Sequence, residues 1–150
     1  MPNTFIADFH IEVVFAPPIA LPLFAQRIPA LNVAGVYFLR EGSCELTEFD
    51  PLSSEVVYIG KANGETIFSR CKKHLQTVQD ARDRNGKPKT RPGERFKAYR
   101  QSIRFDPARI YVIPGLMSAE SPYLVSCAEE YFLYQYAERH GDLPPANTKE

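Results

Sequence analysis

The chain of 150 residues lacks several features that would assign it to a special class of protein. No apolar run approaches the roughly 18–20 residues that a membrane-spanning helix needs. The first ten residues have no basic stretch followed by an apolar one, so no secretory signal is expected. The three cysteines (Cys44, Cys71 and Cys127) are far apart and have no C-x-x-C spacing. They are typical of a reducing cytoplasm rather than of disulfides or zinc. We therefore expect a cytoplasmic protein with no membrane partner.

Several common catalytic and binding motifs are also missing. Gly60-Lys61 lacks the upstream glycine of a phosphate-binding P-loop, and no G-x-G-x-x-G run supports a dinucleotide fold. The three histidines are too far apart in sequence for metal-ligand spacing. Cys71 and His74 are three residues apart, but no neighbouring residue orients them as a nucleophile and base. None of these classes is favoured.

The formal net charge is zero, and apolar residues make up 44% of the chain, near the average for globular proteins. The charge is unevenly distributed. The basic segment, residues 70–104, holds 12 bases against three acids, a net of +9, and the remainder carries −9. This segment is either a solvated face paired with acids elsewhere or a surface that attracts phosphates. Charge alone leaves both interpretations open.

Hydrophobic periodicity predicts strands over 9–15, 33–41, 56–62 and 108–114, the last one stopped by Pro114-Gly115. Helices are expected from Asn63, as N-cap, to about residue 79, over 94–103 and from about 120 to Gly141, with a short helix near 23–28. Residues 81–93 read as an exposed basic loop. These elements predict an α/β fold, a small sandwich with a central short antiparallel sheet of about three strands flanked by helices. Residues 1–32 form an N-terminal strand extension packed on the domain of residues 33–150.

A set of polar residues recurs in a distinctive order along this fold. Gly35-Val36-Tyr37 lies in one strand and Tyr58-Ile59-Gly60 in the next, and Arg70 and His74 share one helical face. Glu129-Glu130 lie within the last helix, and Asn147 follows two prolines in the tail. This order resembles the GIY-YIG nuclease superfamily over about residues 33–147. YIGKA with Arg70 is similar to the nuclease domain of excision-repair endonucleases, and His74 with CAEEYFL to the restriction branch.

The resemblance implies an endonuclease that hydrolyses DNA phosphodiesters with one Mg²⁺ or Mn²⁺ ion. Hydrolysis needs an activated water and relief of charge on the phosphate. We assign Tyr37 as the base toward water and Tyr58 as the group that orients the water or a phosphate oxygen. The Arg70 guanidinium suits the developing charge. His74 shares the proton transfer, and whether it or Tyr37 takes the proton stays open. Lys61 is expected to contact a phosphate.

The resemblance places the metal ligand in the Glu129-Glu130 pair. Alignment with the C-x-E-x-Y pattern favours Glu129, because a single carboxylate leaves positions for waters and phosphate oxygens. Asn147 matches a polar residue after a P-x-N ending, which binds phosphate or ties the tail to the site, although the gap from Glu129 is longer than usual. The remaining substrate-binding candidates are Gly35, Gly60, Lys87, Lys89 and Arg91.

The expected partner is DNA, with RNA as an open alternative. Specificity comes from a homodimer or from a partner protein that delivers the substrate. Two other functions compete with the endonuclease. One is a catalytically silent nucleic-acid-binding module on the same scaffold, which has no need for the Tyr, Tyr, Arg and Glu together. The other is a protein-interaction module whose basic loop engages an acidic partner.

Overall fold

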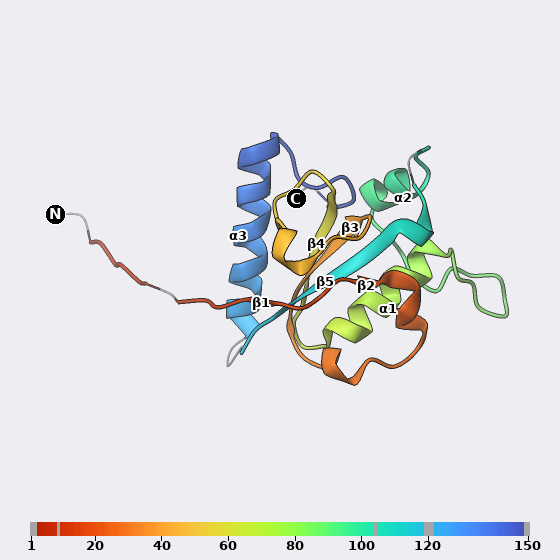
Figure 1. Ribbon diagram of the computed structural model, residues 1–150, viewed down its shortest axis with the longest axis horizontal. Coiled ribbons are helices and arrows are strands. Elements are labelled where there is room, and N and C mark those ends of the chain that lie inside the picture. Colours follow the sequence, from red (N-terminus) through yellow and green to blue (C-terminus); the bar gives the residue numbers. More distant parts are fainter. Residues whose placement is uncertain (1–2, 9, 104, 119–121, 149–150) are drawn as a thin grey trace.

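The computed structural model describes residues 3–8, 10–103, 105–118 and 122–148. Phe9 of the first expected strand, Arg104 of the basic segment and residues 119–121 before the last helix lie outside the described residues. The described chain forms one antiparallel sheet, in which three strands of seven residues are the longest (Figure 1). The strands are β1 (Val14–Phe15), β2 (Ile19–Ala20), β3 (Gly35–Glu41), β4 (Val56–Ala62) and β5 (Ile110–Leu116).

The strand order is β1-β5-β3-β4, and β2 also pairs with β5. Gly35 pairs with Ala62, Tyr37 with Gly60 and Leu39 with Tyr58, so the GVY and YIG tripeptides lie side by side. A bulge follows at Leu39/Arg40. The predicted antiparallel pairing of these two strands is confirmed, and with it the α/β class built around a short antiparallel sheet.

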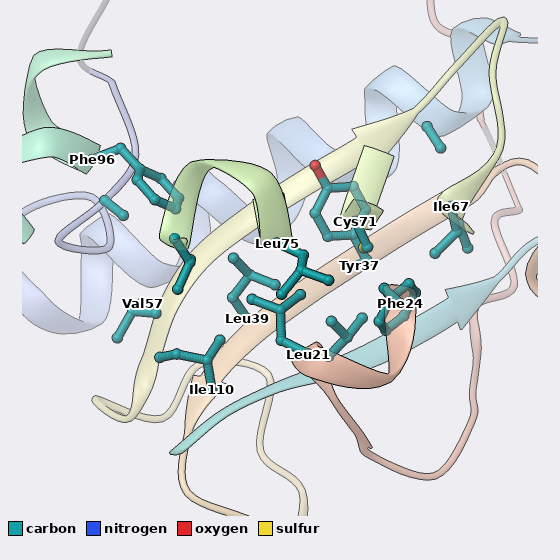
Figure 2. Close-up of a cluster of buried hydrophobic side chains, with 14 of the residues drawn as sticks. Leu21, Phe24, Tyr37, Leu39, Val57, Ile67, Cys71, Leu75, Phe96 and Ile110 are labelled. Carbon is teal, nitrogen blue, oxygen red and sulfur yellow. The ribbon is translucent and has the colours of Figure 1, made fainter. Parts of the chain in front are cut away.

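Helices cover both faces of this sheet. The three α-helices are α1 (Ile67–Val78), α2 (Glu94–Arg100) and α3 (Pro122–His140), and four short 3-10 helices are η1 (Leu21–Ala25), η2 (Pro29–Leu31), η3 (Leu46–Glu48) and η4 (Pro107–Arg109). Side chains of α1, α2 and η1 form one buried cluster with Tyr37 and Leu39 (Figure 2). Val125 and Ala128 of α3 form a second cluster with Val36 and Phe38. The alternation of β3 side chains thus separates the α1 face from the α3 face.

Two expected boundaries are wrong, each for a local reason. The strand expected over 9–15 is only Val14–Phe15, because Val14 already pairs with Leu116 at the end of β5. The first long helix begins at Ile67, and its N-cap is Thr66 rather than Asn63. The Thr66 side chain accepts a hydrogen bond from the Ser69 backbone N–H at 3.0 Å.

The strand expected over 108–114 also runs further than predicted, through Pro114 and Gly115 to Leu116. Proline normally stops a central strand because it has no N–H to donate. Here the Pro114 carbonyl accepts a hydrogen bond from Ala16 at 2.9 Å. Since the N–H and C=O of a strand residue point to the same side, the missing N–H lies on the side of the interrupted β1 and β2 and costs no bond with β3. No helix among the described residues combines the length and apolar character needed to cross a membrane.

Candidate active site

Tyr37 and Tyr58 lie on adjacent strands and converge on His74 of α1. The Tyr37 hydroxyl lies 2.7 Å from His74 Nε2, within hydrogen-bond distance. The two tyrosine rings are stacked with centroids 6.1 Å apart, and the Tyr58 ring meets the imidazole edge at 4.6 Å. Phe96 of α2 stacks on the other side of His74 at 5.5 Å. Four side chains from four elements thus form one aromatic group.

The glycines of both tripeptides allow this packing. A Cβ on Gly60 would lie 2.4 Å from the hydroxyl and from Cζ of Tyr37, and 2.7 Å from the Tyr58 ring. A Cβ on Gly35 would lie 2.4 Å from the Gly115 carbonyl oxygen on β5. Gly60 is thus a close-packing position against both tyrosines, and Gly35 is one between β3 and β5. Neither needs to touch a substrate to explain its identity.

Burial shifts the acid–base properties of the group. Burial, and secondarily the nearby Arg70 cation, lowers the pKa of His74 to about 3, so the imidazole is neutral at pH 7. Burial raises the pKa of Tyr37 well above its usual value, and it also raises the pKa of Tyr58. Both phenols and the imidazole are therefore uncharged in the resting protein. A neutral imidazole beside a phenol O–H offers an acceptor for its proton.

The buried imidazole should make folding sensitive to acid. Between pH 6.5 and about 3 the unfolded chain binds a proton at His74 that the folded protein excludes, so stability falls as the pH drops through this window. The loss has an upper bound of roughly 5 kcal/mol. We expect His74→Gln, which keeps a hydrogen-bonding partner for Tyr37, to lose less stability than the wild type over this range. Urea unfolding of both proteins from pH 7 to pH 3.5 measures the difference, and parallel pH curves would contradict it.

Arg70 lies one helical turn before His74 and faces the same group. Its side chain is 35% exposed, and its Nε is buried without a hydrogen-bond partner in the described structure. The guanidinium lies 4.0 Å from the Glu65 carboxylate, which also pairs with Lys73 at 3.3 Å. The Glu65 carboxylate therefore forms ion pairs with two cations, and the buried Nε–H of Arg70 has no acceptor in the described structure. Such a donor is costly unless a ligand uses it.

A cavity of about 470 Å³ opens beside this group. Tyr58, His74 and Phe96 form its aromatic wall, and the cations that line it are Arg70, Lys73, Lys89 and Arg91. Tyr37 has no exposed surface and lies behind this wall. Basic residues from α1 and from the following loop thus meet at one concavity. This arrangement suits an anionic ligand whose charge is placed near Tyr58.

Glu129 reaches the same edge of the sheet from the opposite face. Its carboxylate is 15% exposed and lies 3.8 Å from the Lys61 ammonium, which also donates to Ser126 at 3.2 Å. The Glu129 charge contributes to the raised pKa of Tyr58, although burial of the phenol contributes more. Glu130 is exposed. The carboxylate that faces Lys61 and the tyrosines is therefore the one that the sequence alignment favoured.

Among the described residues, no three His, Cys, Asp or Glu side chains gather in a way that would hold a metal ion. A single carboxylate agrees with the expected site, because Mg²⁺ in phosphoryl-transfer enzymes is commonly held by one or two carboxylates plus waters and phosphate oxygens. The half-exposed Lys61 does not block that use, since its ammonium can turn to a phosphate. The donor set present here fits one hard divalent ion.

Asn147 ties the C-terminal tail to β4. Its Oδ1 accepts from the Ile59 N–H and its Nδ2 donates to the Ile59 carbonyl, both at 2.9 Å. The Ala146 N–H adds a bond to the Val57 carbonyl. Ile59 lies between Tyr58 and Gly60, so these bonds fix the backbone that presents the second tyrosine. Of the two roles expected for Asn147, the contacts correspond to tying the tail to the site.

We expect Asn147→Ala to destabilise the protein by about 2–4 kcal/mol, because it leaves a buried N–H and C=O of Ile59 without partners. The neighbouring Thr148 is exposed, so Thr148→Ala is the matched control. Urea unfolding gives the free energies, and equal midpoints for the two variants would contradict this role.

Sequence reasoning overlooked two supporting residues. Glu65 holds both Arg70 and Lys73, and Ser126 receives hydrogen bonds from Lys61 and Asn63. Ser126 had no usable signal, because its partners are more than 60 residues away in sequence. Lys87, one of the three lysine and arginine residues expected to bind substrate in the basic loop, lies at an exposed position outside the cavity lining.

No family model, curated protein or solved structure compared with this chain gave a match, so the GIY-YIG resemblance rests on the residues described above.

Proposed function

We propose that this protein is a divalent-metal-dependent endonuclease that hydrolyses DNA phosphodiesters. The observation that carries the proposal is the convergence of five side chains on the edge of the sheet at Tyr58. Two stacked tyrosines and a neutral His74 lie on one side, Arg70 supplies a buried donor, and Glu129 reaches the edge from α3. A water nucleophile, a phosphate and a metal each find suitable groups there.

The proton of the attacking water is best received by Tyr37 and His74 acting together. Because Tyr37 has no exposed surface, the water proton reaches it through the hydroxyl of Tyr58, which lines the cavity and is hydrogen-bonded to Tyr37, while the proton of Tyr37 passes to His74 Nε2, 2.7 Å away. Because burial disfavours the imidazolium, the ring gives that proton up again readily. Tyr58, which lines the cavity, orients the water or a phosphate oxygen. Arg70 donates to the nonbridging oxygens as their charge grows.

Glu129 is the residue that would hold the metal, with Lys61 beside it as a phosphate contact. When bound, the ion supplies Lewis-acid relief of charge on the phosphate and on the leaving oxygen. The chain's own contribution at this point is one carboxylate whose position is set by α3 and the Lys61 ion pair. We also propose a cytoplasmic location, because the three cysteines are unpaired thiols.

The test is cleavage of plasmid and branched DNA with Mg²⁺ or Mn²⁺, with an EDTA control. We expect metal-dependent nicking by the wild type and its loss in a Tyr58→Phe/Arg70→Ala double variant. No cleavage of any substrate in either metal, with DNA binding intact, would overturn the proposal. That outcome would instead indicate the silent nucleic-acid-binding module.

The affinity for DNA should depend on the basic side chains of Lys87, Lys89 and Arg91, which follow α1. We expect the triple variant Lys87→Gln, Lys89→Gln and Arg91→Gln to bind DNA of any sequence more weakly and with a flatter salt dependence. Each lost phosphate contact reduces the slope of log K against log[salt] by roughly 0.9. Fluorescence anisotropy from 50 to 200 mM NaCl measures this slope, and an unchanged slope would remove these residues from the interface.

A further inference from the structure

The bases of the basic segment divide into two groups once ion pairs are counted. Apart from the exposed Lys72 of α1, those described on or near the helices are paired with nearby acids, namely Arg70, Lys73, Arg82, Arg95, Lys97 and Arg100. Within the described residues, no ion pair involves Arg84, Lys87, Lys89 or Arg91. These four follow one another along the chain, and all four are exposed. The unpaired positive charge is therefore concentrated at one place.

That place is a preformed hairpin, residues 81–89, rather than an irregular loop. Arg82 and Pro88 form an antiparallel bridge, and the Lys89 N–H donates to the Ala81 carbonyl at 2.9 Å. Asp83 closes the turn by accepting from the Asn85 and Lys87 N–H groups at 2.8 and 3.0 Å. Gly86 supplies the positive φ of 78° that the turn requires. The shape of the hairpin is therefore defined by hydrogen bonds within its own residues.

The hairpin rises from the rim of the cavity and projects away from the body, at the end opposite α3 (Figure 1). Its outgoing strand continues into Lys89 and Arg91, which line the cavity beside Arg70. Thr90 anchors this strand to α1 through a 2.6 Å bond with the Thr77 hydroxyl. If a polyanion binds with one phosphate at Arg70, its neighbouring phosphates therefore lie close to the hairpin.

We propose that this hairpin inserts into the major groove of double-stranded DNA, which makes duplex DNA the substrate; this inference rests on the proposed endonuclease. The major groove of B-DNA, about 12 Å wide, admits a two-stranded β-ribbon. Arg84 and Asn85 stand at the tip, and these are side chains that pair with guanine and adenine edges. A-form RNA has a deep, narrow major groove that side chains cannot read. The hairpin therefore selects duplex DNA over duplex RNA.

Binding in EDTA tests the proposal apart from cleavage. The probes are a duplex DNA, one of its strands, the matching RNA duplex, and the same duplex DNA with glucosylated hydroxymethylcytosine, whose sugars fill the major groove. We expect wild type to prefer the unmodified duplex over each of the other three probes by about tenfold or more. The double variant Arg84→Ala/Asn85→Ala should lose about tenfold on that duplex and bind modified and unmodified DNA equally.

The matched control is Lys72→Ala, which removes one exposed and unpaired cation from α1 and leaves the hairpin intact. We expect it to keep the wild-type preference for unmodified duplex DNA. Equal losses by the tip variant on single and double strands, or equal wild-type affinity for glucosylated DNA, would overturn groove insertion. If wild type cleaves DNA but the tip variant binds like wild type, this inference fails and the endonuclease stands. If the tip governs duplex binding but no metal supports cleavage, the endonuclease fails and the groove reader stands.

Discussion

Glu129→Gln is expected to abolish metal-dependent cleavage, with a fall in rate of about 10³-fold or more, equivalent to about 4 kcal/mol of transition-state stabilisation. The amide keeps the size of the side chain and removes the charge that would hold a divalent ion. Folding should change little, because the ion pair that is lost joins Glu129 to a Lys61 that is 38% exposed. Single-turnover cleavage at several Mg²⁺ and Mn²⁺ concentrations measures the effect.

Glu130→Gln provides the matched control, since it makes the same chemical change one residue along α3, at an exposed position. We expect it to cleave within about twofold of wild type. If Glu129→Gln stays active while Glu130→Gln does not, the metal ligand is the neighbouring residue. If both variants cleave like wild type, neither glutamate holds the ion and the single-carboxylate site is wrong.

The sequence was most informative where one residue pattern determined one local structure. The β-branched and aromatic run of 56–62 is a strand with the predicted bounds, because its side chains fill both faces of the sheet. Gly141, with φ of 80°, follows the last helix as expected. Errors arose where two residues competed for one role. Asn63 and Thr66 are both good N-caps, and only the Thr66 hydroxyl reaches an N–H of α1.

The candidate site was predictable in its membership but not in its arrangement. The order of the tripeptides and of Arg70 and His74 in the sequence gave no sign that Tyr37 would lie behind the cavity while Tyr58 lined it. That difference arises because Tyr37 is on a central strand and Tyr58 on the strand at the end of the sheet order. Likewise, the sequence left the basic segment as either a paired face or a phosphate surface. Within the described residues, most of its bases proved to be in ion pairs, and those of the hairpin and the strand after it, Arg84, Lys87, Lys89 and Arg91, were not.

Arg70→Ala is expected to slow cleavage by about 10²–10³-fold through kcat, with a smaller change in KM. The guanidinium donates to oxygens whose charge grows only in the transition state, so its loss affects the chemical step more than substrate binding. The Arg70 side chain is partly exposed and lines the cavity in which such an oxygen would lie. Arg70→Lys should recover only part of the rate, because an ammonium lacks the fork of donors.

Lys72→Ala removes a cation two residues away on the exposed side of α1 and should cleave within about twofold of wild type. Equal losses in Arg70→Ala and Lys72→Ala would mean that α1 contributes only general positive charge, and full activity in Arg70→Lys would mean that the fork is not needed.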